Sequence, residues 1–395
     1  MTDRNHSLPS DELNALWSRH NAEWRDTAQI TSQWDQATNI DSKLLQHKTS
    51  GDWWDILAET GLTLLVTREY EHLIMAIHAD TAITYMIMPH PSGIAVDKHT
   101  QTVHIASTRN PNQIYDLKPV TGLIPRRDLN LDGAPVEHKP LIPVSSRFFP
   151  GCMYMHELAV IGGELYANSV GQNAVVRLKS DSTFERVWYP RCIETRAGPI
   201  FDQNHIQLNS IAAGKNIESS FFSASTDKIS KRRPGHRNFP VDGHGVIFSG
   251  KTREAIARGL TRPHSARLHQ DKIWVDNSGY GELVIAENDG ITSVTKLPGW
   301  TRGLYFHENI AFVGTSRVIP RFQQYAPGLD IDKSICGIHA VDISTGTILG
   351  SLTWRYGNQI FAIEAVPGNM TTGFPFHIRR AASHEKSLFY AFKTD

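Results

Sequence analysis

Two histidines, an arginine and an asparagine each stand at the start of a short apolar run, although they are far apart along the chain. The runs read His156-Glu157-Leu158-Ala159-Val160, Asn209-Ser210-Ile211-Ala212-Ala213, His264-Ser265-Ala266-Arg267-Leu268 and Arg302-Gly303-Leu304-Tyr305-Phe306. A neutral imidazole can give or take a proton near neutral pH, and a guanidinium binds a carboxylate or phosphate through two parallel hydrogen bonds. Together these residue types suit acid–base chemistry on a small anionic molecule.

The two histidines occupy equivalent places in their runs, so equivalent strands would bring their side chains together. Neutral nitrogen ligands hold Zn, Fe, Mn or Cu, and a divalent metal ion bound by His156 and His264 is therefore one interpretation. The other is that each imidazole hydrogen-bonds the backbone of an adjacent repeat. Glu157 follows His156 directly and points away from it if the strand alternates, which makes Glu157 a weaker candidate.

Arg302 and Asn209 are predicted to orient a substrate, because a guanidinium cannot serve as a base at ordinary pH. The amide of Asn209 can hold an oxyanion or a metal-bound water. The alternative for Arg302 is a buried ion pair with Glu364 or Glu282. The predicted catalytic residues are thus His156, His264, Arg302 and Asn209, and the predicted metal ligands are the two histidines.

The same phrase occurs six times, because Ser92-Gly93-Ile94-Ala95-Val96 and Phe361-Ala362-Ile363-Glu364-Ala365 complete the series. The spacings range from 38 residues (His264 to Arg302) to 64 residues (Ser92 to His156), and most copies are followed by a turn and a second apolar strand. Repeats of this length in a strand-rich chain predict an all-β, six-bladed β-propeller. The innermost strands of such a ring start near one mouth of the central channel, where we expect the six phrase-start residues to meet.

The chain of 395 residues is long for one domain, but a propeller closes into a single ring of this size. We expect the ring over residues 51–395 and a helical extension over residues 1–50. Ser10 is a candidate N-cap, and apolar and aromatic residues follow at helical spacing. Trp17 and Trp24 lie seven residues apart on one helical face and are predicted to pack against the ring.

Charge and composition exclude several classes of partner. Forty basic residues balance forty acidic ones, so no overall field favours nucleic acid or an anionic membrane. The basic stretch from Lys228 to Arg237 contains Pro234 and Gly235 and is interpreted as a solvated loop or as a lid that meets an anionic substrate.

Targeting and cofactor motifs are also lacking in the sequence. Three scattered cysteines do not form a disulfide framework or a thiolate zinc site. The sequence contains no secretory signal and no apolar run of the ~20 residues that span a bilayer, so a cytoplasmic protein without a membrane partner is expected. No phosphate-binding glycine motif is present, and a nucleotide cofactor is not supported.

Several phrases resemble an uncharacterised bacterial β-propeller family catalogued as a domain of unknown function. The resemblance lies in Pro263-His264-Ser265-Ala266-Arg267 with the later Asp276-Asn277-Ser278-Gly279-Tyr280-Gly281, in Pro298-Gly299-Trp300-Thr301-Arg302, and in Gln359-Ile360-Phe361-Ala362-Ile363. It covers about Gly61 to Pro375 and implies the propeller fold. This chain carries Gln207 where relatives tend to carry a histidine two residues before the asparagine.

Two functions of different class follow from these observations. The first is an enzyme of lyase, hydrolase or isomerase type, with a metal ion as an option, which acts on a small anionic molecule or a modified peptide at the channel mouth. The second is a non-catalytic propeller that holds a partner as a binding or scaffold module. The sequence leaves the substrate, the reaction and the oligomeric state open.

Overall fold

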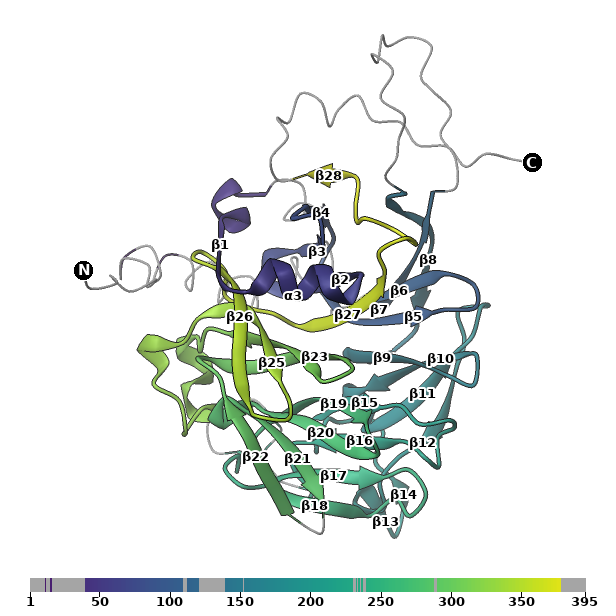
Figure 1. Ribbon diagram of the computed structural model, residues 1–395. Coiled ribbons are helices and arrows are strands. Elements are labelled where there is room, and N and C mark those ends of the chain that lie inside the picture. Colours follow the sequence, from purple (N-terminus) through teal and green to yellow (C-terminus); the bar gives the residue numbers. More distant parts are fainter. Residues whose placement is uncertain are drawn as a thin grey trace.

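The computed structural model describes residues 40–377, except 109–111, 121–138, 152, 230–231, 233, 235, 237–238 and 288–289, together with the single positions 11 and 15. Its main feature is a ring of six antiparallel sheets (Figure 1). The predicted docking of Trp17 and Trp24 lies outside the described residues. None of the helices in the described part of the chain combines the length and the apolarity needed to cross a bilayer.

Each sheet is a blade of four strands that follow one another outward from the channel. Blades one and two are formed by β27 (Ala362–Pro367), β2 (Leu62–Arg68), β3 (Leu73–His78) and β4 (Ile83–Ile87), and by β5 (Pro91–Asp97), β6 (Thr102–Ser107), β7 (Asn112–Pro119) and β8 (Leu141–Phe149). Blades three and four are formed by β9 (Met155–Ile161), β10 (Glu164–Ser169), β11 (Ala174–Leu178) and β12 (Phe184–Trp188), and by β15 (Leu208–Ala212), β16 (Phe221–Ala224), β17 (Gly245–Ser249) and β18 (Ala255–Leu260). Blades five and six are formed by β19 (Pro263–His269), β20 (Lys272–Asn277), β21 (Glu282–Glu287) and β22 (Gly290–Lys296), and by β23 (Trp300–His307), β24 (Ile310–Ser316), β25 (Cys336–Asp342) and β26 (Thr347–Trp354).

Short elements complete the ring. The additional strands are β1 (His47–Gly51) on the edge of blade six, β28 (Phe376–His377) on the edge of blade one, and the hairpin of β13 (Glu194–Thr195) and β14 (Gly198–Pro199). The described helices are α3 (Trp53–Thr60) and the 3-10 turns η2 (Ser42–Leu45), η3 (Glu69–Glu71), η4 (Val170–Gln172), η5 (Arg191–Ile193), η6 (Ser278–Tyr280), η7 (Pro320–Tyr325) and η8 (Ile331–Lys333). β1 lies within the segment assigned from sequence to the extension, and it pairs with β26.

The six phrases found in the sequence correspond to the six innermost strands, so the predicted fold is confirmed. Five phrases lie on β5, β9, β15, β19 and β23, and the sixth leads into β27. Each of these strands contacts the next in a closed cycle, from β5 through β9, β15, β19, β23 and β27 back to β5. Residues at the starts of these strands are therefore brought to one end of the channel.

The ring is closed by pairing the two ends of the described chain. β27 forms the inner strand of blade one and pairs antiparallel with β2, from Leu62 opposite Pro367 to Thr67 opposite Ala362. Figure 1 shows the yellow β27 beside the dark blue β2. In such a ring the inner edge of each blade faces the channel, where it is short and protected.

Apolar side chains fill the spaces between neighbouring blades. Leu65 and Ile94 belong to a cluster between blades one and two, and Trp188 and Phe222 belong to a cluster between blades three and four. Helix α3 covers blade six, where Trp53 is fully buried and its ring lies 5.9 Å, edge-on, from that of Phe312. Because the core sits between the blades, the channel axis is left to polar residues.

Candidate functional site

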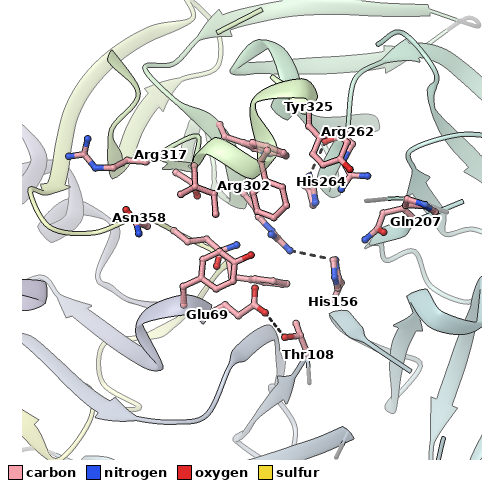
Figure 2. A pocket seen from close by; sticks show the side chains of 18 of the residues that line it. Glu69, Thr108, His156, Gln207, Arg262, His264, Arg302, Arg317, Tyr325 and Asn358 are labelled. Atoms are coloured by element: carbon pink, nitrogen blue, oxygen red, sulfur yellow. Dashed lines mark hydrogen bonds between the residues drawn. The ribbon is translucent and has the colours of Figure 1, made fainter. Parts of the chain in front are cut away.

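A pocket at one mouth of the channel contains four of the six phrase-start residues. His156, His264, Arg302 and Phe361 all line it, and they come from four different blades. The cavity has a volume of about 150 Å³. The strand starts thus bring an arginine and both predicted histidines into one enclosed space (Figure 2).

Ser92 and Asn209 are buried outside this lining and join neighbouring blades. The hydroxyl of Ser92 lies 3.0 Å from the carbonyl oxygen of Ala106 and 2.8 Å from that of Met155. The amide nitrogen of Asn209 donates to the carbonyl of Pro263 at 2.8 Å. The amide donor of Asn209 is thus engaged between blades, and an orienting role for this residue stays a prediction.

β-bulges at the starts of the inner strands shape the lining. The register between β19 and β20 shifts between His264 and Arg267, and that between β23 and β24 shifts between Thr301 and Leu304. A bulge breaks the two-residue alternation of a strand and re-aims the side chains around it. Ser265 and Gly303 have left-handed backbones at these bulges, with φ of 53° and 88°, and the Gly303 N–H donates to the Ser265 hydroxyl at 2.8 Å.

Arg302 enters the pocket as a partly buried cation. Its Nη2 atom lies 3.5 Å from Nδ1 of His156, and its guanidinium carbon lies 3.4 Å from the centre of the Phe361 ring. Figure 2 shows the guanidinium directed toward His156. Burial lowers the pKa of Arg302 to about 10, and neighbouring Arg262 acts in the same direction, while Glu69 and Tyr70 oppose the change.

The ion pairs considered from sequence for Arg302 are not formed. Glu364 contacts Arg267 at 3.3 Å, and Glu282 lies 3.8 Å from Lys296. Within the described ranges, Arg302 forms no ion pair with a carboxylate. At neutral pH the pocket therefore contains a positive charge that a carboxylate or phosphate would compensate.

The hydrogen bonds of His264 indicate which of its two ring nitrogens carries the proton. Nδ1 lies 2.9 Å from the carbonyl oxygen of Arg262 and 3.0 Å from the hydroxyl of Ser278, which itself donates to Thr301 at 2.6 Å. Both neighbours therefore accept, so the proton belongs on Nδ1 and the lone pair on Nε2. Burial, together with the charge of Arg302, holds the pKa of His264 well below its usual range and keeps the ring neutral.

Five further lining residues share one sequence position, which the motifs drew attention to only at Gln207. Each precedes a phrase-start residue by two positions, and they are Tyr154, Gln207, Arg262, Trp300 and Gln359. Three of them have left-handed backbones, with φ of 50° at Tyr154, 51° at Gln207 and 53° at Arg262. The constant offset is visible in the sequence and would have identified them.

Arg262 is a second guanidinium of the pocket without a carboxylate partner among the described residues, and it is buried. Its guanidinium carbon lies 4.5 Å from the ring centre of Tyr325, and its Nη1 donates to the hydroxyl of Ser225 at 3.3 Å. Its buried Nε has no hydrogen-bond partner in the described ranges, and burial lowers its pKa. Arg317 also lines the pocket, but its donors bond the backbone carbonyls of Gly357, Ser334 and Arg355.

The acidic side chain in the described lining is Glu69. Its carboxylate accepts a hydrogen bond of 2.5 Å from the hydroxyl of Thr108. Two guanidiniums, Arg302 and Arg262, thus face the pocket without a carboxylate partner, against one carboxylate. The electrostatic balance favours an anion.

The donor set does not match a divalent cation. Within the residues that the structure describes, no three His, Cys, Asp or Glu side chains are grouped so as to hold a metal ion. The guanidinium 3.5 Å from His156 would also repel a cation bound by that imidazole. We therefore derive no chemical step through a metal.

A second ionic cluster closes the channel away from this pocket. Arg267 lies 3.0 Å from Glu157 and 3.3 Å from Glu364, and the fully buried Asp276 is close by. Burial raises the pKa of Glu364 to about 7, although Arg267 opposes the change. Glu157 does not line the pocket, as strand alternation predicts.

The basic stretch from Lys228 to Arg237 reaches the pocket at one described residue. Pro234 belongs to the lining, and the Arg232 side chain lies 3.3 Å from Nε2 of His236. The other residues of the stretch lie largely outside the described ranges, so its interpretation as a lid stays a prediction.

Comparison with solved structures finds remote similarities. The chain is similar to one in a nidogen/laminin complex (8% identity, TM-score 0.49, covering 77% of this chain and 98% of that one). It is also similar to a gluconolactonase from Xanthomonas campestris (12%, 0.43, 75% and 86%) and to a catalytically inactive variant of virginiamycin B lyase from Staphylococcus aureus (12%, 0.38, 73% and 76%). Similarities this remote say nothing about activity.

Sequence comparison places the chain in a family. A search of the curated proteins finds no match. Residues 51–373 match the family described as a domain of unknown function, DUF4915. Because this match spans most of the chain and agrees with the resemblance found in the motifs, the protein belongs to the DUF4915 family.

Proposed function

We propose that the protein is an enzyme that carries out acid–base chemistry on a small anionic molecule in the pocket at the channel mouth. Arg302 and Arg262 bind the anionic group, and Nε2 of His264 exchanges a proton with the substrate. His156, beside Arg302, is the second proton-transfer group. The reaction class is that of a lyase, hydrolase or isomerase, in which protons move without a nucleotide cofactor.

The observation that carries this proposal is a pair of guanidiniums, Arg262 buried and Arg302 partly buried, without carboxylate partners among the described residues. Burying a charge without a partner is unfavourable, and an anion held by charge-assisted hydrogen bonds removes the penalty. A structural arginine normally has its donors satisfied, as Arg317 does through three backbone carbonyls. Arg302 and Arg262 therefore have the features of ligand-binding groups.

The state of His264 supports a role in proton transfer. In the free protein its ring is neutral because of burial and the positive charge of Arg302. A bound anion would offset that charge and raise the pKa of the imidazole toward the range in which a histidine exchanges protons efficiently. Binding of the anionic substrate thus raises the pKa of His264 and makes the imidazole a better proton acceptor.

The size of the cavity supports a small molecule over a modified peptide. A volume of about 150 Å³ is well below the 300–1,000 Å³ that is typical of pockets for drug-sized ligands. The balanced charge of the chain supports the absence of a nucleic-acid partner. A metal ion at His156 and His264, and a cytoplasmic location, stay sequence-based hypotheses.

The test separates an enzyme from a binding module. A substrate is sought by comparing metabolites in cells with and without the gene, and turnover and binding are then measured for the wild type and for His264→Gln. The proposal expects the variant to bind and to lose turnover. Binding without turnover by the wild type would establish the non-catalytic alternative, and metal content that falls in His156→Ala and His264→Ala would restore the metal hypothesis.

A further inference from the structure

One wall of the pocket is built from aromatic rings. Trp300 lies at the start of β23, and Phe322 and Tyr325 lie on the turn η7 of the same blade. The ring centres are 5.8 Å apart for Trp300 and Phe322, 6.4 Å for Trp300 and Tyr325, and 5.9 Å for Phe322 and Tyr325. These three residues, here called the aromatic wall, all line the pocket.

The aromatic wall contacts one of the two guanidiniums, and a further aromatic ring of the pocket lining, Phe361, contacts the other. Arg262 lies over the ring of Tyr325, and Arg302 lies over Phe361. Stacking covers a face of each guanidinium and leaves its N–H edge as the side for hydrogen bonds. A planar carboxylate bound at that edge would project the rest of the molecule toward the rings.

The inner part of this partly open pocket is small. A cavity of about 150 Å³ is the size that accommodates one benzene ring. The aromatic wall presents mainly ring surface, which contacts another ring favourably, and the hydroxyl of Tyr325 has no hydrogen-bond partner within the described ranges.

We propose that the ligand of this pocket is a carboxylate that carries one planar apolar ring, with the carboxylate at Arg302 and Arg262 and the ring against the aromatic wall. This inference rests on the proposed function and specifies its substrate class. It predicts discrimination against polyhydroxylated acids of the same charge.

The experiment uses three carboxylates as probes and isothermal titration calorimetry on the full chain. Benzoate carries charge and ring, acetate carries charge alone, and gluconate carries charge with hydroxyl groups. Benzoate is expected to bind about three- to tenfold more tightly than acetate or gluconate, as one good aromatic contact provides. Phenyl phosphate shows whether a phosphate replaces the carboxylate.

Two variants at Phe322 separate the ring contact from folding. Phe322 is partly exposed on a turn, so Phe322→Ala and the apolar Phe322→Leu are both expected to fold, which circular dichroism verifies. Each should weaken benzoate binding while acetate binding stays unchanged.

The outcomes distinguish this inference from the proposal on which it rests. Tighter binding of gluconate than benzoate, or benzoate binding that both Phe322 variants leave unchanged, overturns the ring assignment and leaves the anion pocket intact. Binding of none of the probes, or binding that Arg302→Lys does not weaken, overturns the anion pocket itself.

Discussion

Arg302 affects both anion binding in the pocket and the protonation state of His264. It lies within 3.5 Å of His156, stacks on Phe361, and lowers the pKa of His264. Its charge makes the pocket attractive to an anion and keeps the histidine neutral until one arrives. Loss of this side chain should therefore alter binding and proton transfer together.

Arg302→Lys tests the binding role with the charge preserved. Lysine lacks the planar fork that forms two parallel hydrogen bonds, so anion affinity should fall about tenfold while the melting temperature changes little. Calorimetric titration measures the affinity. Arg177→Lys, at a solvent-accessible ion pair in blade three, is the matched control, and equal effects of the two changes would contradict the assignment.

The two histidines are predicted to act as a unit. His156→Ala and His264→Ala should each remove most activity, and the double variant should lose little more, because groups that act in one step are not additive. Steady-state kcat on an identified substrate provides the comparison. If both single variants keep full activity, the channel mouth is not the active site.

At the scale of the strand, the bulge in β23 positions Arg302. Gly303 adopts φ of 88°, and a Cβ atom there would lie 2.9 Å from the Ile363 side chain on β27. Gly259 in β18 has nearly the same φ, 87°, but a Cβ atom added there would meet no other atom within 4 Å. An alanine at either glycine adds the strain of a left-handed backbone, but only an alanine at Gly303 adds a steric clash. Comparing the two variants therefore separates these effects.

Gly259→Ala should reduce the free energy of unfolding by about 1–2 kcal/mol, the penalty of a left-handed alanine. Gly303→Ala should reduce it further and should also weaken anion binding, because the clash displaces the neighbouring Arg302. Urea denaturation and calorimetry test both effects. Equal losses of stability, with anion binding unchanged, would show that the bulge does not position the site.

The inner strands could be predicted from the sequence. The backbone conformations of the residues before these strands, and the contacts between blades, could not. A polar residue before an apolar run identified most of the inner strands, since such strands must be buried and must start at the channel. Left-handed backbones at Tyr154, Gln207 and Arg262 could not be predicted, because these residue types do not require that conformation. The contact of Asn209 with Pro263 depends on how the blades pack, which is a long-range property of the ring.

At the scale of the whole molecule, the cluster of Arg267, Glu157 and Glu364 lies where the inner strands of three blades meet. Because burial raises the pKa of Glu364 to about 7, the folded protein holds a proton that the unfolded chain releases above its ordinary pKa of 4.5. The stabilisation is complete below pH 4.5 and is lost as the pH rises through 7.

Glu364→Gln removes this ionisation and retains a hydrogen-bonding group for Arg267. The variant should gain stability relative to the wild type between pH 5 and pH 8, on the order of 2 kcal/mol. Urea denaturation of both proteins at the two pH values gives the difference directly. A difference that does not change with pH would exclude a raised pKa at Glu364.

The proposed activity is the conversion of a small anionic molecule in the pocket at the channel mouth. The most direct measurement incubates purified wild type and His264→Gln with a metabolite extract from cells that lack the gene, and follows all anionic compounds by mass spectrometry. We expect the wild type to consume one anionic compound and form a product, and His264→Gln to leave that compound unchanged. An extract that neither protein alters, or that both alter equally, would contradict the proposed activity.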